Sequence, residues 1–170
     1  MEHPASEAQV DFGVMEAVEE GKTREIQLLV MSFPCSNVAF HEPMPSEIQE
    51  CFLEGLKKLF GKVGFVARKI RIDNLTPAAK KIRSKTEEAQ LTDECLRFQL
   101  NYGFETQVCN VLKRNEKGHV EKKVVYIRYN FFSVPPVITG LEDLSEKLLA
   151  FSIHDQYRTH YKKQIEIHEL

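Results

Sequence analysis

The sequence predicts an α/β fold in which a mixed five-stranded sheet carries helices on both faces. Two observations lead to this prediction. Three strand-like segments come first and are joined by short connections, as in an antiparallel meander. Helical and strand-like segments then alternate along the rest of the chain, which favours a mixed sheet covered on both sides. With 170 residues, of which 42% are hydrophobic, the chain is long enough to bury the core of such a fold.

The meander is expected in residues 8–14, 24–33 and 37–41. Side chains alternate between the two faces of a strand, so Val10 lies on one face of the first strand and Asp11 on the other.

A helix should follow the meander. Ser46 and Gln49 form a capping box at its start, and Gly61 is expected to end it. Residues 66–73 form the fourth strand. We assign nothing to residues 76–90 beyond a helical turn, because this stretch is polar and basic.

In the second half of the chain, Thr92 is expected to cap a helix that Gly103 stops. Residues 104–108 form the fifth strand. Residues 116–131 form a helix, because Val120 begins a series of apolar residues at helical spacing. The order β-β-β-α-β-α-β-α-α is the ribonuclease-H-like arrangement.

Two consecutive prolines end that helix and set the expected domain organisation. Residues 1–135 form the core, and residues 136–170 form a C-terminal helical extension. Thr139 and Glu142 are expected to cap the helix of this extension.

Composition excludes several classes of protein. The chain has no apolar run of membrane-spanning length and no basic-then-apolar signal at its start, so a cytoplasmic location and no membrane are expected. Four cysteines lie far apart with no Cys-x-x-Cys pair, which favours reduced structural thiols over a zinc site or a disulfide framework.

The net charge is −2, but the charges are unevenly distributed. Residues 1–56 carry two basic and eleven acidic side chains, whereas residues 57–85 carry ten basic side chains and one acidic. A second basic stretch covers residues 113–128. These stretches could hold a polyanion, or they could be solvated helix faces. The candidate DNA contacts are Lys80, Lys81, Arg83, Lys85, Lys113, Arg114 and Lys117.

Three carboxylates stand where a charge is unfavourable unless it has a partner. Asp11 lies inside the first strand, Asp73 ends the fourth strand, and Glu121 lies beside the apolar stripe of the 116–131 helix. A small set of hard oxygen ligands suits Mg²⁺, and two such ions about 4 Å apart promote phosphodiester chemistry. The alternative is structural: each carboxylate could cap a backbone group or pair with a lysine or arginine.

The motifs around these carboxylates resemble the catalytic core of IstA-type insertion-sequence transposases. The matching segments are residues 9–13, 71–75 and 116–121, which contain the three carboxylates in order. The resemblance covers nearly the whole chain. It departs from the family in two loops, at Gly64–Ala67 and after Asn110.

The resemblance implies a DDE integrase core of ribonuclease-H fold, with Asp11, Asp73 and Glu121 as its triad. It also implies two Mg²⁺ ions, with Mn²⁺ able to substitute. The expected partners are DNA (transposon ends and target), an IstB-type ATPase and further copies of the chain assembled on DNA.

Two alternatives to a transposase core stay open. The first aspartate stands at residue 11, and no helix-turn-helix region precedes it, so the chain could be a truncated, inactive remnant that only contacts DNA or transposase subunits. The second alternative is a related nuclease that hydrolyses RNA–DNA hybrids.

Overall fold

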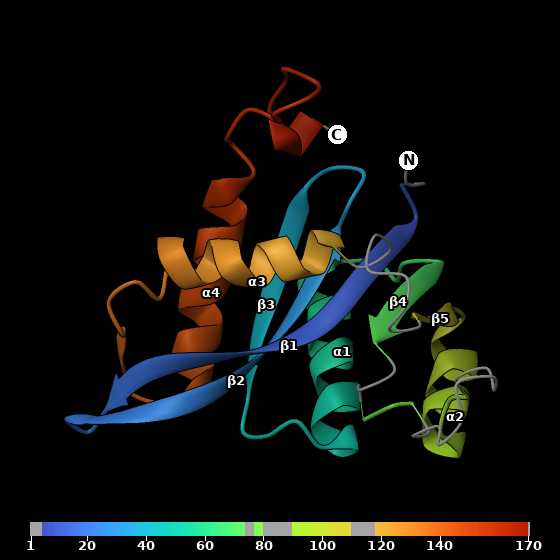
Figure 1. Cartoon of the computed structure of the whole chain (residues 1–170), viewed down its shortest axis with the longest axis horizontal. Helices are drawn as coiled ribbons and strands as arrows, with labels where there is room; N and C mark the ends of the chain where they lie inside the picture. Colours follow the sequence, from blue (N-terminus) through green and yellow to red (C-terminus); the bar gives the residue numbers. More distant parts are fainter. Residues whose placement is uncertain (1–4, 74–76, 80–89, 110–117, 170) are drawn as a thin grey trace.

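The computed structural model describes residues 5–73, 77–79, 90–109 and 118–169 of the chain. Its six strands form one mixed sheet in the order β3-β2-β1-β4-β5, with β6 beside β1 (Figure 1). β1, β2 and β3 are antiparallel neighbours, whereas β4 and β6 run parallel to β1 and β5 runs parallel to β4. The strands are β1 (Glu7–Glu19), β2 (Lys22–Phe33), β3 (Val38–Met44), β4 (Lys69–Asp73), β5 (Glu105–Cys109) and β6 (Val137–Ile138).

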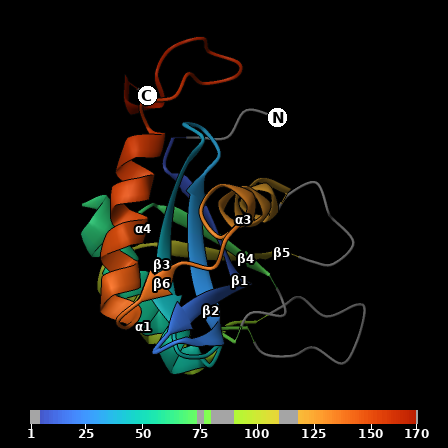
Figure 2. The same cartoon turned by 90° about the vertical axis from the view of Figure 1, so that its left-hand side faces the viewer.

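Helices cover both faces of this sheet, as the sequence predicts. In Figure 1, α3 crosses in front of the strands and α1 lies behind them. Figure 2 shows α4 alongside β3, where the two elements make many contacts. The helices are α1 (Gln49–Val63), α2 (Asp93–Tyr102), α3 (Gly118–Asn130) and α4 (Leu141–Asp155), followed by the short 3₁₀ helix η2 (Ile167–Glu169).

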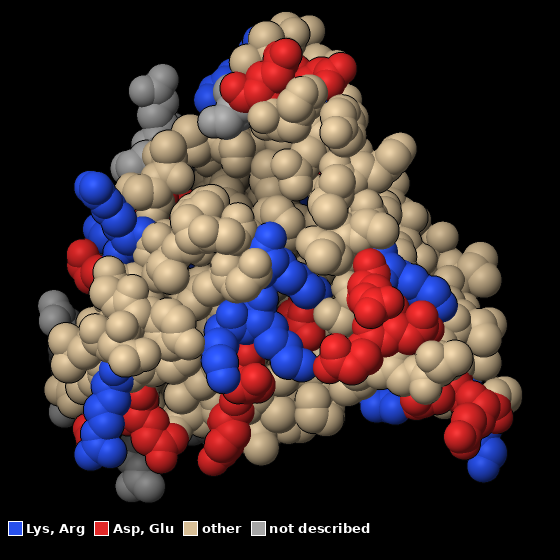
Figure 3. Space-filling model, turned by 180° about the vertical axis from the view of Figure 1, so that it is seen from behind, with Lys and Arg blue, Asp and Glu red and all other residues tan. Residues whose placement is uncertain are grey.

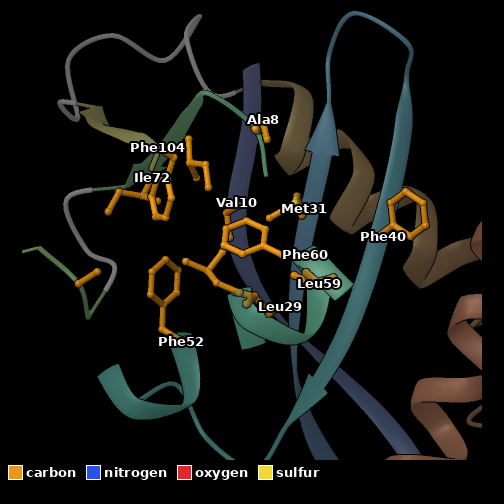
Figure 4. Packing of buried hydrophobic residues seen from close by; sticks show 14 of the residues in the cluster. Ala8, Val10, Leu29, Met31, Phe40, Phe52, Leu59, Phe60, Ile72 and Phe104 are labelled. Atoms are coloured by element: carbon orange, nitrogen blue, oxygen red, sulfur yellow. The ribbon is translucent and has the colours of Figure 1, made fainter. Parts of the chain in front are cut away.

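Two hydrophobic clusters hold the layers together. The first joins the sheet to α1 and α2, with Val10, Leu29 and Phe52 among its buried side chains (Figure 4). The second lies under α3 and α4, where Val120 and Leu144 are fully buried. The apolar spacing that predicts a helix around Val120 is therefore confirmed, because that stripe packs on the sheet.

The caps of α2 are as predicted. The Thr92 hydroxyl accepts a hydrogen bond from the backbone N–H of Cys95 at 3.3 Å, and Gly103 ends the helix with a positive φ of 74°. A glycine suits that position because it adopts the left-handed conformation without a steric penalty.

The predicted caps of α1 are wrong. The residue before the helix is Ile48, which makes no side-chain cap, and Ser46 instead accepts a hydrogen bond from the N–H of Ile48. Gly61 stays inside the helix, and Gly64, with a φ of 84°, ends it. The helix continues past Gly61 because packing of its apolar face outweighs the low helix propensity of one glycine.

The predicted capping pair of α4, Thr139 with Glu142, is also wrong. The N-cap position is Gly140 and has no side-chain cap. The carboxylate of Asp143 instead accepts a hydrogen bond from the N–H of Thr139 at 3.0 Å. Thr139 therefore pairs with Asp143, the residue after the predicted partner Glu142.

The sheet differs from the prediction in several details. β1 continues to Glu19, beyond the predicted end at residue 14, and β3 continues to Met44, beyond residue 41. β4 begins at Lys69 rather than at residue 66, and β6 adds a sixth strand of two residues. The N–H of Val18 donates to the carbonyl of Pro136 at 2.8 Å, so the chain after the two prolines continues along β1. Prolines that end a helix also favour extended backbone, which makes such pairing possible.

The cysteines and the helices agree with the expectations from composition. All four cysteines are free thiols, and Cys95 and Cys109 are buried. Burial raises the pKa of the Cys95 thiol to about 11, so this thiol is an inert core residue. Across the described part of the chain, no helix combines the length and the apolar character that a membrane span requires.

Candidate active site

Two of the three candidate carboxylates lie on adjacent strands of the sheet. β1 and β4 are adjacent and parallel, and Gln9 lies opposite Arg71. If this register continues for two residues, Asp11 lies opposite Asp73, the last residue of β4. Neighbouring strands are about 4.8 Å apart, so the two carboxylates share one small area of the sheet. Both side chains are half-buried.

The two aspartates project from the face that α3 covers. Side chains alternate along β1, so Asp11 lies on the face opposite to Val10, which belongs to the first cluster. On the α3 face, the side chain of Gln9 accepts a hydrogen bond from the N–H of Val120 at 3.1 Å. Two residues before Gln9, the Glu7 carboxylate pairs with Arg71 at 3.1 Å and ties β1 to β4.

α3 crosses β1 at close range on both sides of Asp11. A Cβ added to Gly13 would lie 2.7 Å from a methyl group of Val124, so only glycine fits at this position without a shift. The contact of Gln9 with Val120 precedes Asp11, and the contact of Gly13 with Val124 follows it. Asp11 therefore lies under the turn of α3 that contains Glu121.

Glu121 lies on the flank of α3 that faces β1. Each residue of a helix turns about 100°, so Glu121 and Arg128 are within about 20° of each other around the helix axis. The guanidinium of Arg128 reaches the backbone carbonyl of Val14 on β1 at 3.4 Å. Lys123 lies on the other flank and donates to the carbonyl of Asn37 in the β2–β3 turn.

The structure does not gather the full triad. Glu121 is exposed, and among the described residues no three Asp, Glu, His or Cys side chains lie close enough to hold a metal ion. Asp11 and Asp73 nevertheless fit Mg²⁺, since this ion commonly takes one or two carboxylates from the protein and keeps several waters. The donor set that the strands supply is therefore suitable for one hard cation.

The predicted DNA contacts lie outside the described residues. The strand ends next to them are nevertheless placed, because Asp73 at the end of β4 pairs with Cys109 at the end of β5. The residues concerned are Lys80, Lys81, Arg83, Lys85, Lys113, Arg114 and Lys117.

A second charged region, which the sequence did not predict, lies on the Lys123 flank of α3. It is a groove of about 1140 Å³ between the β2–β3 turn, the first half of α3 and the segment after α4. We call it the basic groove, because no Asp or Glu is among the described residues that line it. Its cationic and histidine side chains are His119, Lys122, Lys123, Arg158, His160, Lys162 and Lys163.

Lys123 is the buried cation of this groove. Its side chain is 5% exposed, and its ammonium donates to the carbonyl of Asn37 at 2.6 Å. Burial, with the charge of Arg158 beside it, lowers the pKa of Lys123 to about 7, although Asp155 partly opposes the shift. The sequence held a signal for this residue, since Lys123 stands within the apolar stripe three residues after Val120.

The back of the molecule differs from the basic groove because it carries charges of both signs. In Figure 3, Lys and Arg side chains are interspersed with Asp and Glu side chains over the lower half of that face. Part of the mixture is buried: Lys62 pairs with Glu42 at 2.5 Å, and Ser145 donates to the same carboxylate at 3.0 Å. Several described cations outside the basic groove, among them Lys58 and Lys62, therefore pair with a carboxylate.

Comparison with known proteins relates the chain to transposases by sequence. It is 30% identical over 154 residues to a Geobacillus stearothermophilus protein described as a transposase for insertion sequence element IS5376. The match covers 89% of this chain but 36% of that protein, so the chain spans about a third of the relative's length. No family model matches the chain.

Comparison with solved structures relates the fold to retroviral integrases. A chain of the simian T-cell lymphotropic virus intasome, in complex with PP2A regulatory subunit B56 gamma, matches with a TM-score of 0.68 at 13% identity, over 98% of this chain and 54% of that one. The HTLV-2 integrase catalytic core domain in complex with magnesium matches with TM-scores of 0.57 in its trimeric form and 0.58 in its dimeric form. Identities are 12% and 14%, over 98% and 96% of this chain and 95% and 93% of the cores.

These matches confirm the ribonuclease-H-like fold, since integrase catalytic cores have the same arrangement over nearly the whole chain. The sequence match adds that the chain is transposase-like. The IstA type, the metal and the partners are not specified by either comparison.

Proposed function

We propose that this chain is the catalytic core of an IstA-type DDE transposase, which cleaves DNA strands and joins them to target DNA. One observation carries the proposal: β1 and β4 are adjacent and parallel with Gln9 opposite Arg71, and this register, continued for two residues, would set Asp11 opposite Asp73. Two carboxylates at such a separation are a suitable pair of hard oxygen ligands for Mg²⁺, which commonly takes one or two carboxylates from the protein. The similarity to a transposase-like sequence and to integrase cores agrees with this reading.

Asp11 and Asp73 would hold Mg²⁺, with Glu121 completing the triad from α3. The bound ions would supply charge stabilisation at the attacked phosphorus and activate the attacking oxygen. The protein's own part is to hold the two aspartates in register and to bring Glu121 over them. Gly13 contributes to that placement, since its lack of a Cβ lets α3 approach β1.

The proposal extends to partners and location. The substrates would be the ends of the element and the target DNA, and the helper would be an IstB-type ATPase. Assembly of several copies on DNA is supported by the dimeric and trimeric forms named for the HTLV-2 core. We further propose a cytoplasmic location, and a core of residues 1–135 with residues 136–170 as its helical extension.

Strand cleavage and joining of a labelled DNA duplex carrying the element's ends would test this function, with Mg²⁺ or Mn²⁺ present. Asp11→Asn, Asp73→Asn and Glu121→Gln should each lower the rate by more than about a hundredfold, since even outer contacts to a metal site cost 10- to 100-fold. Glu16→Gln is the matched control, because Glu16 is an exposed carboxylate farther along β1. Undiminished cleavage by the three variants would refute the assignment.

A second readout separates an active core from an inactive remnant. Mg²⁺ or Mn²⁺ should raise the melting temperature of the wild type, because a ligand that binds only the folded state stabilises it. Asp11→Asn and Asp73→Asn should lose this response. A metal response without cleavage would favour the remnant, and cleavage of RNA–DNA hybrids in preference to duplex DNA would favour the nuclease.

A further inference from the structure

The basic groove contains a buried histidine with an unused hydrogen-bond donor. His160 is 3% exposed, and its Nδ1 accepts hydrogen bonds from the backbone N–H groups of Lys162 and Lys163 at 3.2 and 3.1 Å. With Nδ1 accepting, the proton of a neutral ring lies on Nε2. Nε2 is buried and has no hydrogen-bond partner in the part of the chain that the structure describes.

The cations around His160 are only partly compensated. Arg158 pairs with Asp155 at 2.8 Å and, together with Lys123, donates to the carbonyl of Asn37. One carboxylate and one carbonyl therefore serve two cations. Lys162 and Lys163, beyond them, line the same groove. A buried donor without an acceptor is costly, so this arrangement is suited to an oxyanion.

We propose that the basic groove binds the phosphodiester backbone of DNA, away from the aspartates. Arg158 and the Nε2–H of His160 would donate to one phosphate, while Lys122, Lys162 and Lys163 would contact the neighbouring phosphates. The choice of DNA as the polyanion rests on the proposed function, whereas the binding of phosphate oxygens rests on the groove alone.

Size and an aromatic side chain favour a nucleic acid over a small anion or an acidic peptide. The volume of about 1140 Å³ exceeds that of pockets for one small ligand, which are about 300–1,000 Å³. Tyr161 is 65% exposed, and its ring stacks on His160 at 5.0 Å with an interplanar angle of 21°. An exposed ring in a cationic groove is a platform on which a base can stack.

The test measures binding of fluorescein-labelled DNA to the whole chain by anisotropy, in EDTA so that no metal contributes. Lys162→Gln/Lys163→Gln should weaken binding by roughly tenfold and lower the slope of log K against log salt by about 2, one for each lost phosphate contact. Lys22→Gln/Arg97→Gln is the control, because it removes the same charge from exposed basic side chains on β2 and α2, outside both basic stretches. The control should leave both quantities close to those of the wild type.

Two further measurements address the occupant. Adding DNA should shift the imidazole ¹⁵N signal of Nε2 of His160. If Lys162 and Lys163 had only a structural role, DNA would leave this signal unchanged. Equal losses in the groove and control variants, or wild-type protein that does not bind DNA, would overturn the proposal. Polyglutamate that displaces DNA and responds equally to the groove variant would assign the groove to an acidic polypeptide and would also overturn it.

The outcome is separable from that of the proposed function. Groove-dependent DNA binding by a protein that cleaves nothing would leave this inference standing and refute the active core. Metal-dependent cleavage, with DNA binding unaffected by Lys162→Gln/Lys163→Gln, would support the active core and refute the inference about the groove.

Discussion

On one flank of α3, the exposed carboxylate of Glu121 lies on the side of β1 and Asp11. On the other flank, Lys123 and Arg158 share the carbonyl of Asn37. On the second flank, the two cations Lys123 and Arg158 have one carboxylate beside them, that of Asp155. A third arrangement, Lys62 with buried Glu42, is a complete ion pair. The difference teaches that charges neutralised within the fold serve stability, whereas charges left in excess on the same scaffold indicate binding.

The largest difference in stability is expected between substitutions of two lysines. Lys62 has a carboxylate partner of its own, whereas Lys123 shares Asp155 with Arg158. Lys62→Met should lower the free energy of unfolding by about 3–5 kcal/mol, because it leaves the buried Glu42 carboxylate without its closest cation. Lys123→Met should leave stability unchanged or raised near neutral pH, since it removes a buried charge whose pKa is already lowered. Urea unfolding at pH 7 measures both.

The Lys62→Met/Glu42→Gln double variant is the control for the first of these effects. It should recover much of the lost stability, because no unpaired charge then remains buried. If Lys123→Met costs as much as Lys62→Met, the distinction between neutralised charges and charges in excess is broken.

A smaller effect is expected at Gly13, which sets the distance between α3 and β1. Gly13→Ala should cost about 1–3 kcal/mol, the usual range for overpacking, because the new methyl group would lie 2.7 Å from Val124. Cleavage should decline further than the loss of folded protein explains, since Glu121 moves with the helix. Val124→Ala in the same chain should restore both activity and stability; a rescue of stability alone would show that this helix placement does not matter for the site.

The smallest effect is the contribution of His41 to the pH dependence of stability. His41 is buried, and the charges of Lys123 and Lys62 act on it. Burial, with the charges of Lys123 and Lys62, lowers the pKa of His41 to about 3 from 6.5. Between these values the unfolded chain binds a proton that the folded chain does not, so stability is lost as the pH falls below about 6.5. The loss attributable to His41 between pH 7 and pH 5 should be at most about 2 kcal/mol.

His41→Gln should reduce this loss, because glutamine does not titrate and can keep the contact with Ser152. Urea unfolding at the two pH values gives the difference. An identical pH dependence in the variant would show that His41 is protonated equally easily in both states.

Local sequence determined the elements whose signals are short-range. The strands of the meander, the Thr92 cap and the glycine at 103 follow from periodicity and capping chemistry, and the structure confirms them. The predictions at Ser46 and Gly61 were wrong because capping patterns compete with packing: α1 continues to Val63, which packs against the first cluster, and Gly64 then ends it.

The sequence by itself determined the fold class and the position of each aspartate along the chain. Asp73 comes 62 residues after Asp11, and the paired residues of β1 and β4 differ by the same 62 positions. Only the tertiary structure decided which flank of α3 faces the sheet, and that Lys123, Arg158 and His160 line one groove. Those residues come from α3 and from the segment after α4, which no local periodicity relates. Their proximity arises from packing of α3 and α4 on the sheet, a long-range effect that single-sequence patterns do not record.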